Sequence, residues 1–293
     1  MGIGRYAIRE CFCGGLIGGL AGGSQPISNQ TVSLLLRRLV WNEKSVCHRY
    51  RRRQSRLRYC AINALNEVDV FFIIDKGQEK EDLVRVRKEI CERYIKDKSY
   101  RVVETPDPPR DRKASAYEPA VRAWHEQRAG LYERLICDEL GEDECGAFLV
   151  WGDPSLYDST LRIIDLIVAR GTTTFEYEVI PGISAIQALA ARHRIALNRI
   201  GRSVHITTGR KIAEGLPNNI DDVIVMLDAD CSFKSVDDPE IDIYWGAYIG
   251  TEEEILVSGN LRTHMHDIER MRTEAKSRKG WIMDTYLLRK RDV

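Results

Sequence analysis

The segment from Trp151 to Thr160 concentrates side chains that could bind a polar ligand. It follows a short apolar run, so it lies where a buried strand should end, which is where open α/β sheets bind ligands. Gly152 lets a ligand approach the backbone, and Pro154 has a fixed φ that suits the first turn of a helix. Asp153 could simply cap that helix. Capping would leave Tyr157 and the neighbouring hydroxyls unexplained, so we favour a ligand site; these hydroxyls are on Ser155, Ser159 and Thr160.

Two other turns have the same character. The segment Val179–Ala185 reads V-I-P-G-I-S-A and passes from an expected strand into an expected helix. The segment Ile206–Arg210 reads I-T-T-G-R and also follows an expected strand. Each turn alone is weak evidence. Three of them on repeated strand-to-helix units indicate a ligand site in a cleft between two domains.

Alternating strands and helices must position these turns. From Ala61 to Ile180, helical periodicity alternates with short apolar runs, which predicts a mainly parallel sheet with helices on both faces. The expected helices are 61–68, 80–95, 116–140 and 155–170, and the expected strands are 70–74, 101–103, 147–151 and 175–180.

The alternation restarts after the polar link 198–202 and predicts a second, smaller α/β domain. Its expected strands are 203–207, 223–227, 241–248, 255–257 and 281–288, and its expected helices lie near Lys211 and over 266–279. We therefore divide the chain into an N-terminal segment outside the fold (1–45), an N-terminal domain (46–198) and a C-terminal domain (199–293).

The balanced charge of the whole chain hides two segments of opposite character. Residues 1–60 hold 11 Lys and Arg against 2 Asp and Glu, and the remainder holds 33 basic and 42 acidic residues. A continuous basic surface is therefore not expected, and neither is nucleic-acid binding. No apolar run reaches the roughly 18–20 residues of a membrane-spanning helix, so we expect no membrane association.

The eight cysteines show neither C-x-x-C pairs nor a histidine at zinc-finger spacing, so no metal site is expected. Scattered single thiols are typical of a reducing cytosol, which favours a cytoplasmic location.

Three motifs carry a resemblance to the tetrapyrrole (corrin/porphyrin) methylases. They are Gly152-Asp153-Pro154-x-x-Tyr157, the segment Val179–Ser184, and Trp245-Gly246-Ala247-Tyr248. The segments 149–164, 205–210 and 280–286 are similar to the branch of this family that methylates a precorrin with loss of acetate. The resemblance runs from about Ala61 to the C-terminus.

The resemblance implies a two-domain α/β fold, each domain a mixed, mainly parallel sheet flanked by helices, with the active cleft between them. It implies S-adenosylmethionine as cofactor and methylation of precorrin-5 at C1, with release of acetate, to give precorrin-6A. Asp153 and Tyr157 would be the catalytic residues, with Tyr157 facing the reacting carbon. Carried over motif by motif, the cofactor-binding residues would be Gly152, Asp153, Pro154, Ser155, Pro181, Gly182, Ser184, Met226, Gly246 and Ala247. A homodimer is an open possibility.

A precorrin substrate carries many carboxylates, and arginine forks suit such groups. The candidate substrate-binding residues are Arg110, Arg112, Lys113, Arg192 and Arg194. The alternative for each is an ordinary solvated surface charge.

One family motif is missing. The family that this chain resembles begins with a strand that ends in a Gly-rich turn. In this chain that turn should come just before Ala61. The chain instead has six arginines between Arg49 and Arg58. Read one base later, the codons for Val46–Ala61 are compatible with S-V-I-G-I-G-A-G-N-P-D-Y-V-T-V-Q, which is such a strand and turn. We interpret the segment as a frameshift ending near Cys60. The alternative is a true N-terminal extension with a basic arm.

The missing turn leaves two further functions open. The chain could be a catalytically impaired methylase-like protein that binds ligand, or a methyltransferase of the same fold with a different substrate.

Sequencing the genomic DNA across codons 40–62 is expected to show an inserted or deleted base upstream of codon 47 and a compensating change near codon 60. The reason is that the shifted frame restores the Gly-rich segment where the family pattern needs it. Confirmed DNA whose third bases do not encode I-G-I-G-A-G in the shifted frame would refute the interpretation.

Overall fold

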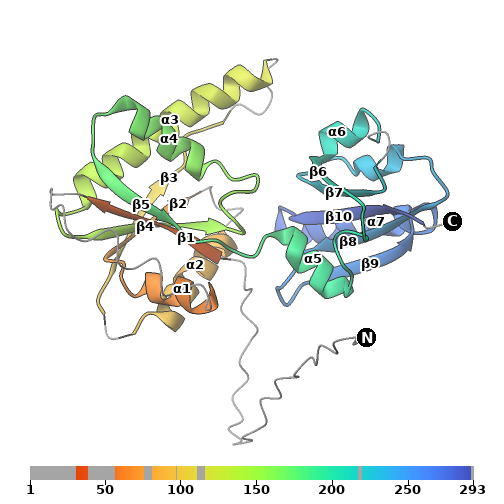
Figure 1. Ribbon diagram of the computed structural model, residues 1–293, viewed down its shortest axis with the longest axis horizontal. Coiled ribbons are helices and arrows are strands. Elements are labelled where there is room, and N and C mark those ends of the chain that lie inside the picture. Colours follow the sequence, from red (N-terminus) through yellow and green to blue (C-terminus); the bar gives the residue numbers. More distant parts are fainter. Residues whose placement is uncertain are drawn as a thin grey trace, which may run out of the picture.

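The computed structural model describes residues 31–38, 57–75, 81–96, 98–110, 116–216 and 220–291, of which 31–38, 57–60 and 81–83 are described by their backbone alone. The chain forms two α/β domains joined by the segment that leads from β5 into α5 (Figure 1). The two-domain α/β fold class is confirmed.

The first domain is built on a five-stranded sheet of order β3-β2-β4-β1-β5. Its strands are β1 (Thr31–Arg38), β2 (Val70–Asp75), β3 (Arg101–Pro106), β4 (Cys145–Trp151) and β5 (Phe175–Val179). Helices α1 (Leu57–Leu65) and α2 (Glu81–Tyr94) cover one face, and α3 (Tyr117–Glu139) and α4 (Thr160–Arg170) cover the other (Figure 1). Side chains alternate along β2, so that Phe71 and Phe72 are buried in cores on opposite faces.

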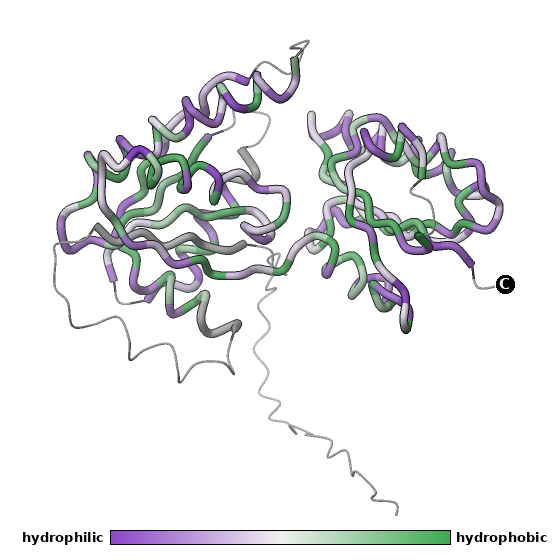
Figure 2. Tube along the Cα trace, turned by 45° about the horizontal axis from the view of Figure 1, so that its top comes forward, coloured by the Kyte–Doolittle hydropathy of each residue, from purple (hydrophilic) through white to green (hydrophobic). Residues whose placement is uncertain are grey.

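The second domain is built on a five-stranded sheet of order β6-β7-β10-β8-β9. Its strands are β6 (Val204–Thr208), β7 (Asp222–Met226), β8 (Ile241–Ala247), β9 (Ile255–Asn260) and β10 (Asp284–Lys290). Its helices are α5 (Ala185–His193), α6 (Gly209–Ala213), the 3₁₀ helix η3 (Ser232–Ser235) and α7 (Leu261–Lys279). Figure 2 shows mostly hydrophobic residues along the strands and alternating hydrophilic and hydrophobic residues along the helices. This is the amphipathic pattern that buries a core.

The periodicities from Ala61 onward identified these elements except β1 and η3, with the largest errors at the starts of α4 and α7. The expected mainly parallel pairing holds for β3-β2-β4 and for β6–β7. The other pairs of the second sheet are antiparallel, because β10 returns between β7 and β8 and a short connection joins β8 to β9.

The position of β1 corrects one expectation. We expected residues 1–45 to lie outside the fold, yet Thr31–Arg38 pairs with both β4 and β5. Its sequence TVSLLLRR contains a short apolar run of the kind that occupies the interior of a sheet. The strand runs antiparallel to both neighbours, with Thr31 opposite Trp151. The rest of 1–45, and 46–56 of the Arg-rich segment, lie outside the described residues.

Helix α5 contacts β8, β9 and β10 of the second sheet. It therefore packs with the second domain, although our boundary at residue 198 assigned it to the first. We propose that the structural division falls in the segment between β5 and α5, and the boundaries at 46, 198 and 199 stay predictions.

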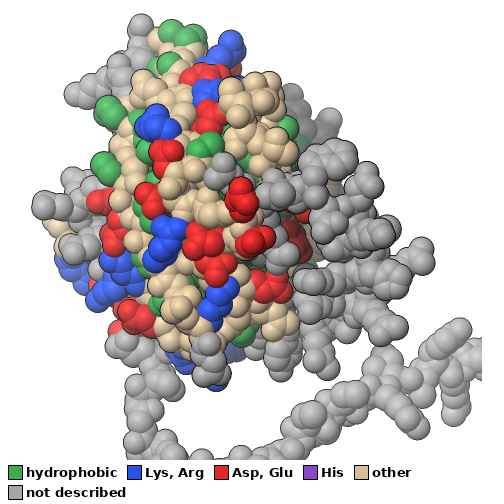
Figure 3. Space-filling view, turned by 90° about the vertical axis from the view of Figure 1, so that its left-hand side faces the viewer, with side chains coloured by type: hydrophobic (Ala, Val, Ile, Leu, Met, Phe, Trp, Pro, Cys, Tyr) green, Lys and Arg blue, Asp and Glu red, His purple; other side chains and the backbone are tan. Residues whose placement is uncertain are grey.

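The described surface carries both signs of charge. Figure 3 shows acidic and basic side chains interspersed over one end of the first domain. Ion pairs such as Arg101–Glu139 and Arg170–Glu133 neutralise part of this charge. None of the described helices combines the length and apolar character of a membrane span.

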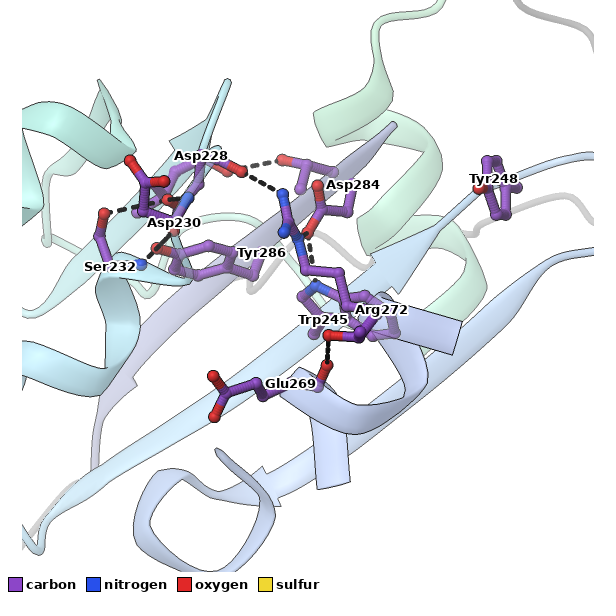
Figure 4. Close-up of polar contacts among 12 residues, drawn as sticks. Asp228, Asp230, Ser232, Trp245, Tyr248, Glu269, Arg272, Asp284 and Tyr286 are labelled. Atoms are coloured by element: carbon purple, nitrogen blue, oxygen red, sulfur yellow. Dashed lines mark hydrogen bonds and ion pairs between the residues drawn. The ribbon is translucent and has the colours of Figure 1, made fainter. Parts of the chain in front are cut away.

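A buried polar network holds the end of β7 (Figure 4). Asp228 accepts hydrogen bonds from the Tyr286 hydroxyl at 2.7 Å and from the Ser232 backbone N–H at 2.7 Å. Arg272 donates to the Asp228 carbonyl at 2.6 Å and to the Asp284 carboxylate at 2.9 Å. Because removing one partner would leave another buried polar group unsatisfied, the network fixes the loop after Met226.

The same network explains Gly209 in the I-T-T-G-R turn. A Cβ atom on Gly209 would overlap the carboxylate of Asp228, which its hydrogen bonds hold in place. This glycine is therefore required by packing.

Gly209→Ala is expected to lower the free energy of unfolding by about 1–3 kcal/mol, because the added methyl group overpacks a fixed buried carboxylate. The measurement is urea denaturation. Gly130→Ala in α3 is the matched control, since its Cβ would only contact arginine side-chain ends at 3.8 Å, and its stability should be unchanged or slightly higher. Equal losses in the two variants would contradict the packing argument.

Candidate functional site

Asp153 joins two of the three turns. Its Oδ1 accepts hydrogen bonds from the backbone N–H of Ser155 at 2.9 Å and from the Ser155 hydroxyl. Its Oδ2 accepts the backbone N–H of Gly182 at 2.8 Å. Burial opposes ionisation of Asp153, but these hydrogen bonds outweigh it and lower its pKa. An ionised carboxylate thus connects the turn after β4 to the turn after β5, and it does not cap a helix.

Tyr157 lies in an extended turn, not in a helix. We expected a helix from Ser155, but α4 begins at Thr160. Tyr157 has φ 52°, which a right-handed helix cannot include. Asp158 accepts a hydrogen bond from the Thr160 backbone N–H at 2.7 Å. Asp158 therefore supports the start of α4, a role that the sequence had suggested for Asp153. The Tyr157 side chain is 43% exposed, and burial of the remainder raises its pKa.

A bulky residue with positive φ costs of order 1–3 kcal/mol and is found at functional sites more often than elsewhere. The φ of 52° orients the Cα–Cβ bond of Tyr157 differently from that of a helical residue. Because the pKa of Tyr157 is raised, the phenol is neutral and can donate a hydrogen bond.

The turn after β4 also touches the second domain. Leu156 packs against the cluster formed by α5 and one face of the second sheet, in which half-buried Met226 takes part. Leu227, the next residue, has φ 53° and is 66% exposed. The end of β7 therefore presents an apolar side chain next to the region where the two domains meet, and the Asp228 network holds it there.

The second turn has a structural part and an exposed part. Ser184 is buried as the N-cap of α5, where it forms a reciprocal capping box with Gln187. Its hydroxyl is therefore used by the helix, which leaves Ser184 poorly placed for the expected cofactor contact. Pro181 is exposed, and the Ile183 side chain is 45% exposed beside Gly182.

The glycine-alanine pair of β8 is buried. A Cβ atom on Gly246 would lie 2.8 Å from Ile249 Cδ1 and 3.0 Å from Leu189 Cδ1, so glycine here lets α5 pack against β8. The side chain of Ala247 is fully buried in the core on the other face. Neither residue presents a side-chain surface to a ligand, and a cofactor could reach them only through the backbone.

The expected cofactor-binding set is therefore brought together in part. Gly152, with φ 80°, and Pro154 are buried supports of the turn that carries Asp153 and exposed Ser155. Gly182 is tied to that turn through Asp153, and Met226 packs against the same buried cluster as Leu156 of that turn. Among the described residues, no group of three or more His, Cys, Asp or Glu side chains could hold a metal ion.

The candidate arginines separate into different environments. Arg110 is exposed and donates to the Tyr117 hydroxyl at 3.1 Å. Arg192 donates to Glu254 at 2.6 Å, so its charge is already paired. Arg194 ends α5 in the left-handed region at φ 57° and is exposed. Arg112 and Lys113 lie outside the described residues.

Arg210 is a residue that our motif-based reasoning did not single out. Its guanidinium carbon lies 4.0 Å from the ring centroid of Tyr117, so α6 of the second domain contacts α3 of the first. The I-T-T-G-R turn contained the signal, but only the tertiary structure shows the partner. The exposed apolar side chains of Ile183 and Leu227 were missed in the same way.

Comparisons with known proteins agree on one family. The model of the Tetrapyrrole (Corrin/Porphyrin) Methylases matches residues 59–264, so the match begins just after the Arg-rich segment. A Sinorhizobium protein named precorrin-6A synthase [deacetylating] is 51% identical over 230 residues, which is 78% of this chain and 88% of the relative. A crystal structure of a cobalamin synthesis related protein (CobF) from Corynebacterium diphtheriae is also similar. It is 36% identical with a TM-score of 0.67, over 80% of this chain and 92% of that chain. On these matches, the chain belongs to the tetrapyrrole (corrin/porphyrin) methylases.

Proposed function

We propose that the chain is an S-adenosylmethionine-dependent C-methyltransferase of cobalamin biosynthesis, which methylates precorrin-5 at C1 and releases acetate to give precorrin-6A. The observation that carries the proposal is the 51% identity to the Sinorhizobium relative over 88% of its length. Identity at this level across both domains supports the same reaction, and the site geometry suggests how the residues contribute. A cytoplasmic location would suit this pathway and the free thiols.

The residues around Asp153 fit an adenosyl sulfonium. Asp153 provides an ionised carboxylate, and Ser155 provides an exposed hydroxyl. Ile183 and Leu227 provide exposed apolar surface on the neighbouring turns. This amphipathic set matches a ligand with a cationic centre, hydroxyl groups and a flat base. S-adenosylmethionine, when bound, supplies a methyl group already activated by its sulfonium sulfur.

The task of the protein is therefore mainly alignment. Asp153 fixes two turns relative to each other, so that groups on both keep one geometry. Tyr157 is held by its backbone conformation and would direct a neutral phenol toward the macrocycle. Leu156 of this turn packs on the second domain. This packing would keep the turn after β4 at a fixed position relative to the second domain.

A second candidate function is a methylase-like protein that binds ligand with little turnover. One observation favours it. Strand β1 runs antiparallel to β4 and β5, so its C-terminal residue Arg38 pairs with Phe175 at the start of β5. A turn after Arg38 would therefore leave from the edge opposite Asp153, and β1 cannot supply a Gly-rich turn at the ligand edge.

Restoring the shifted-frame sequence over residues 46–60 should raise turnover at least about 100-fold, because it returns alignment worth several kcal/mol. The measurement is a coupled assay of methyl incorporation and acetate release from a precorrin substrate. Equal activity of the chain as given and the repaired chain would contradict the structural argument. A repaired chain that binds no S-adenosylhomocysteine in calorimetry would contradict the proposed function.

In the repaired chain, Tyr157→Phe should reduce turnover about tenfold or more and leave the affinity for S-adenosylhomocysteine nearly unchanged, because the phenol is placed toward the substrate. Tyr177→Phe is the matched control, since Tyr177 on β5 is also 43% exposed. A loss of cofactor affinity without a loss of turnover would reverse the role given to Tyr157.

Asp153→Ala in the repaired chain should weaken S-adenosylhomocysteine binding about tenfold or more, because the two turns lose the carboxylate that joins them. Asp165→Ala, a change at an exposed position of α4, serves as control. Calorimetry measures the affinity and urea denaturation the stability. Unchanged affinity in a folded Asp153→Ala variant would show that cofactor binding does not need Asp153 to join the two turns.

A further inference from the structure

Two arginines from different domains meet at one tyrosine. Arg110 follows β3 in the first domain, Tyr117 begins α3, and Arg210 lies in α6 after β6 of the second domain. The guanidinium carbons lie 5.6 Å (Arg110) and 4.0 Å (Arg210) from the centroid of the Tyr117 ring. Two cations, one from each domain, thus lie within cation–π range of the Tyr117 ring.

Neither cation is neutralised by a described carboxylate. Several other described arginines form ion pairs: Arg128 with Asp107, Arg192 with Glu254, and Arg170 with Glu126 and Glu133. In the described part of the chain, the contacts of Arg110 and Arg210 are with aromatic rings and the Tyr117 hydroxyl. The hydrogen bond from Arg110 lowers the pKa of Tyr117, and the nearby charge of Arg210 adds to this effect. Two like charges beside one ring repel each other, and an anion that contacts both would relieve the repulsion.

The loop that carries Arg110 is held firmly. Asp107 forms an ion pair with Arg128 at 2.9 Å, and both side chains are largely buried. Trp124 donates from its indole N–H to the Pro108 carbonyl at 3.0 Å. The guanidinium carbons of Arg110 and Arg128 lie 5.3 Å and 4.7 Å from the centroid of the Trp124 ring. Arg110 is exposed, but its side chain contacts Tyr117 and Trp124 and its loop is held by Asp107 and Pro108.

The same support connects the arginines to the candidate site. Arg128 donates to the Ser159 hydroxyl at 3.0 Å. Ser159 is two residues from Tyr157 on the turn after β4. The position of the Arg110 loop is thus fixed relative to the turn that we assign to the substrate.

We propose that Arg110 and Arg210 together form a substrate carboxylate site, in which one carboxylate arm of the tetrapyrrole bridges the two domains across Tyr117. The proposal rests on the proposed function for the identity of the substrate, and it adds Arg210 and Tyr117 to the substrate-binding residues. Guanidinium groups pair with carboxylates in a planar, bidentate geometry, so two of them suit one acetate or propionate arm. An arm held from both sides would also hold the domains together while the methyl group is transferred.

The test uses the full chain and uroporphyrin, a stable tetrapyrrole with eight carboxylates, with its octamethyl ester as the uncharged counterpart. Fluorescence titration measures the affinity for each. The unmodified chain should bind the acid at least about tenfold more tightly than the ester, with an affinity that falls as salt rises. Arg110→Gln and Arg210→Gln should each weaken binding of the acid about tenfold and leave binding of the ester unchanged.

The double variant separates a shared site from two independent charges. If one carboxylate bridges both arginines, the double variant should lose little more than either single variant, because the two changes remove the same interaction. Arg122→Gln, an exposed change on the helix that carries Tyr117, is the matched control and should bind like the unmodified chain. Tyr117→Phe keeps the ring and should have a small effect.

Three outcomes would overturn the inference: equal affinity for acid and ester, full binding by folded Arg110→Gln and Arg210→Gln variants, or fully additive losses in the double variant. Calorimetry with S-adenosylhomocysteine tests the proposed function separately. Cofactor binding that persists in all variants, together with loss of uroporphyrin binding, would support the site. Absence of cofactor binding in the repaired, otherwise unsubstituted chain would instead count against the proposed function and leave the uroporphyrin result to be judged on its own.

Discussion

The carboxylate of Asp153 is the interaction on which the rest of the candidate site depends. One oxygen orders the turn after β4 through Ser155, and the other holds the turn after β5 through Gly182. A single ionised side chain thus sets the distance between two turns that we propose to face the ligand. The turn that carries Asp153 also carries Tyr157, and its Leu156 packs on the second domain. Displacing Asp153 would therefore move the proposed substrate-facing phenol and the domain contact together.

Strand direction is the second constraint. In a sheet, the turn after a strand leaves from the edge at which that strand ends, and Trp151 of β4 ends at the ligand edge. Strand β1 begins there, with Thr31 opposite Trp151. It fills the space between β4 and β5 with backbone pairing, but it directs the chain away from the site. The pairing of β1 thus fills its place in the sheet, while the Gly-rich turn of the family pattern is lacking among the described residues. Stability of the fold and competence of the site are therefore separate.

The two domains meet through contacts of different character. Apolar packing of Leu156 near Met226 excludes water and is insensitive to charge. The contact of Arg210 with Tyr117 involves a cation that has no carboxylate partner among the described residues, and on our proposal it depends on what anion is near. The first contact suits a permanent support, and the second suits a contact that responds to a charged substrate. Burial of the Asp228 network behind β7 keeps the second domain rigid enough for both to act at defined positions.

Periodicity and turn residues determined much of this protein from the sequence alone. They identified the strands and helices after Ala61, the turns at 152–157 and 180–184, and the family. They did not predict contacts between residues that are far apart in the sequence. Tertiary structure decided three points. Asp153 accepts a hydrogen bond from Gly182 and does not cap a helix, and Ser184 caps α5. Arg210 contacts the ring of Tyr117. The physical reason is that local sequence encodes which face of an element is buried, while strand order and crossovers decide which turns and side chains then lie within hydrogen-bond distance.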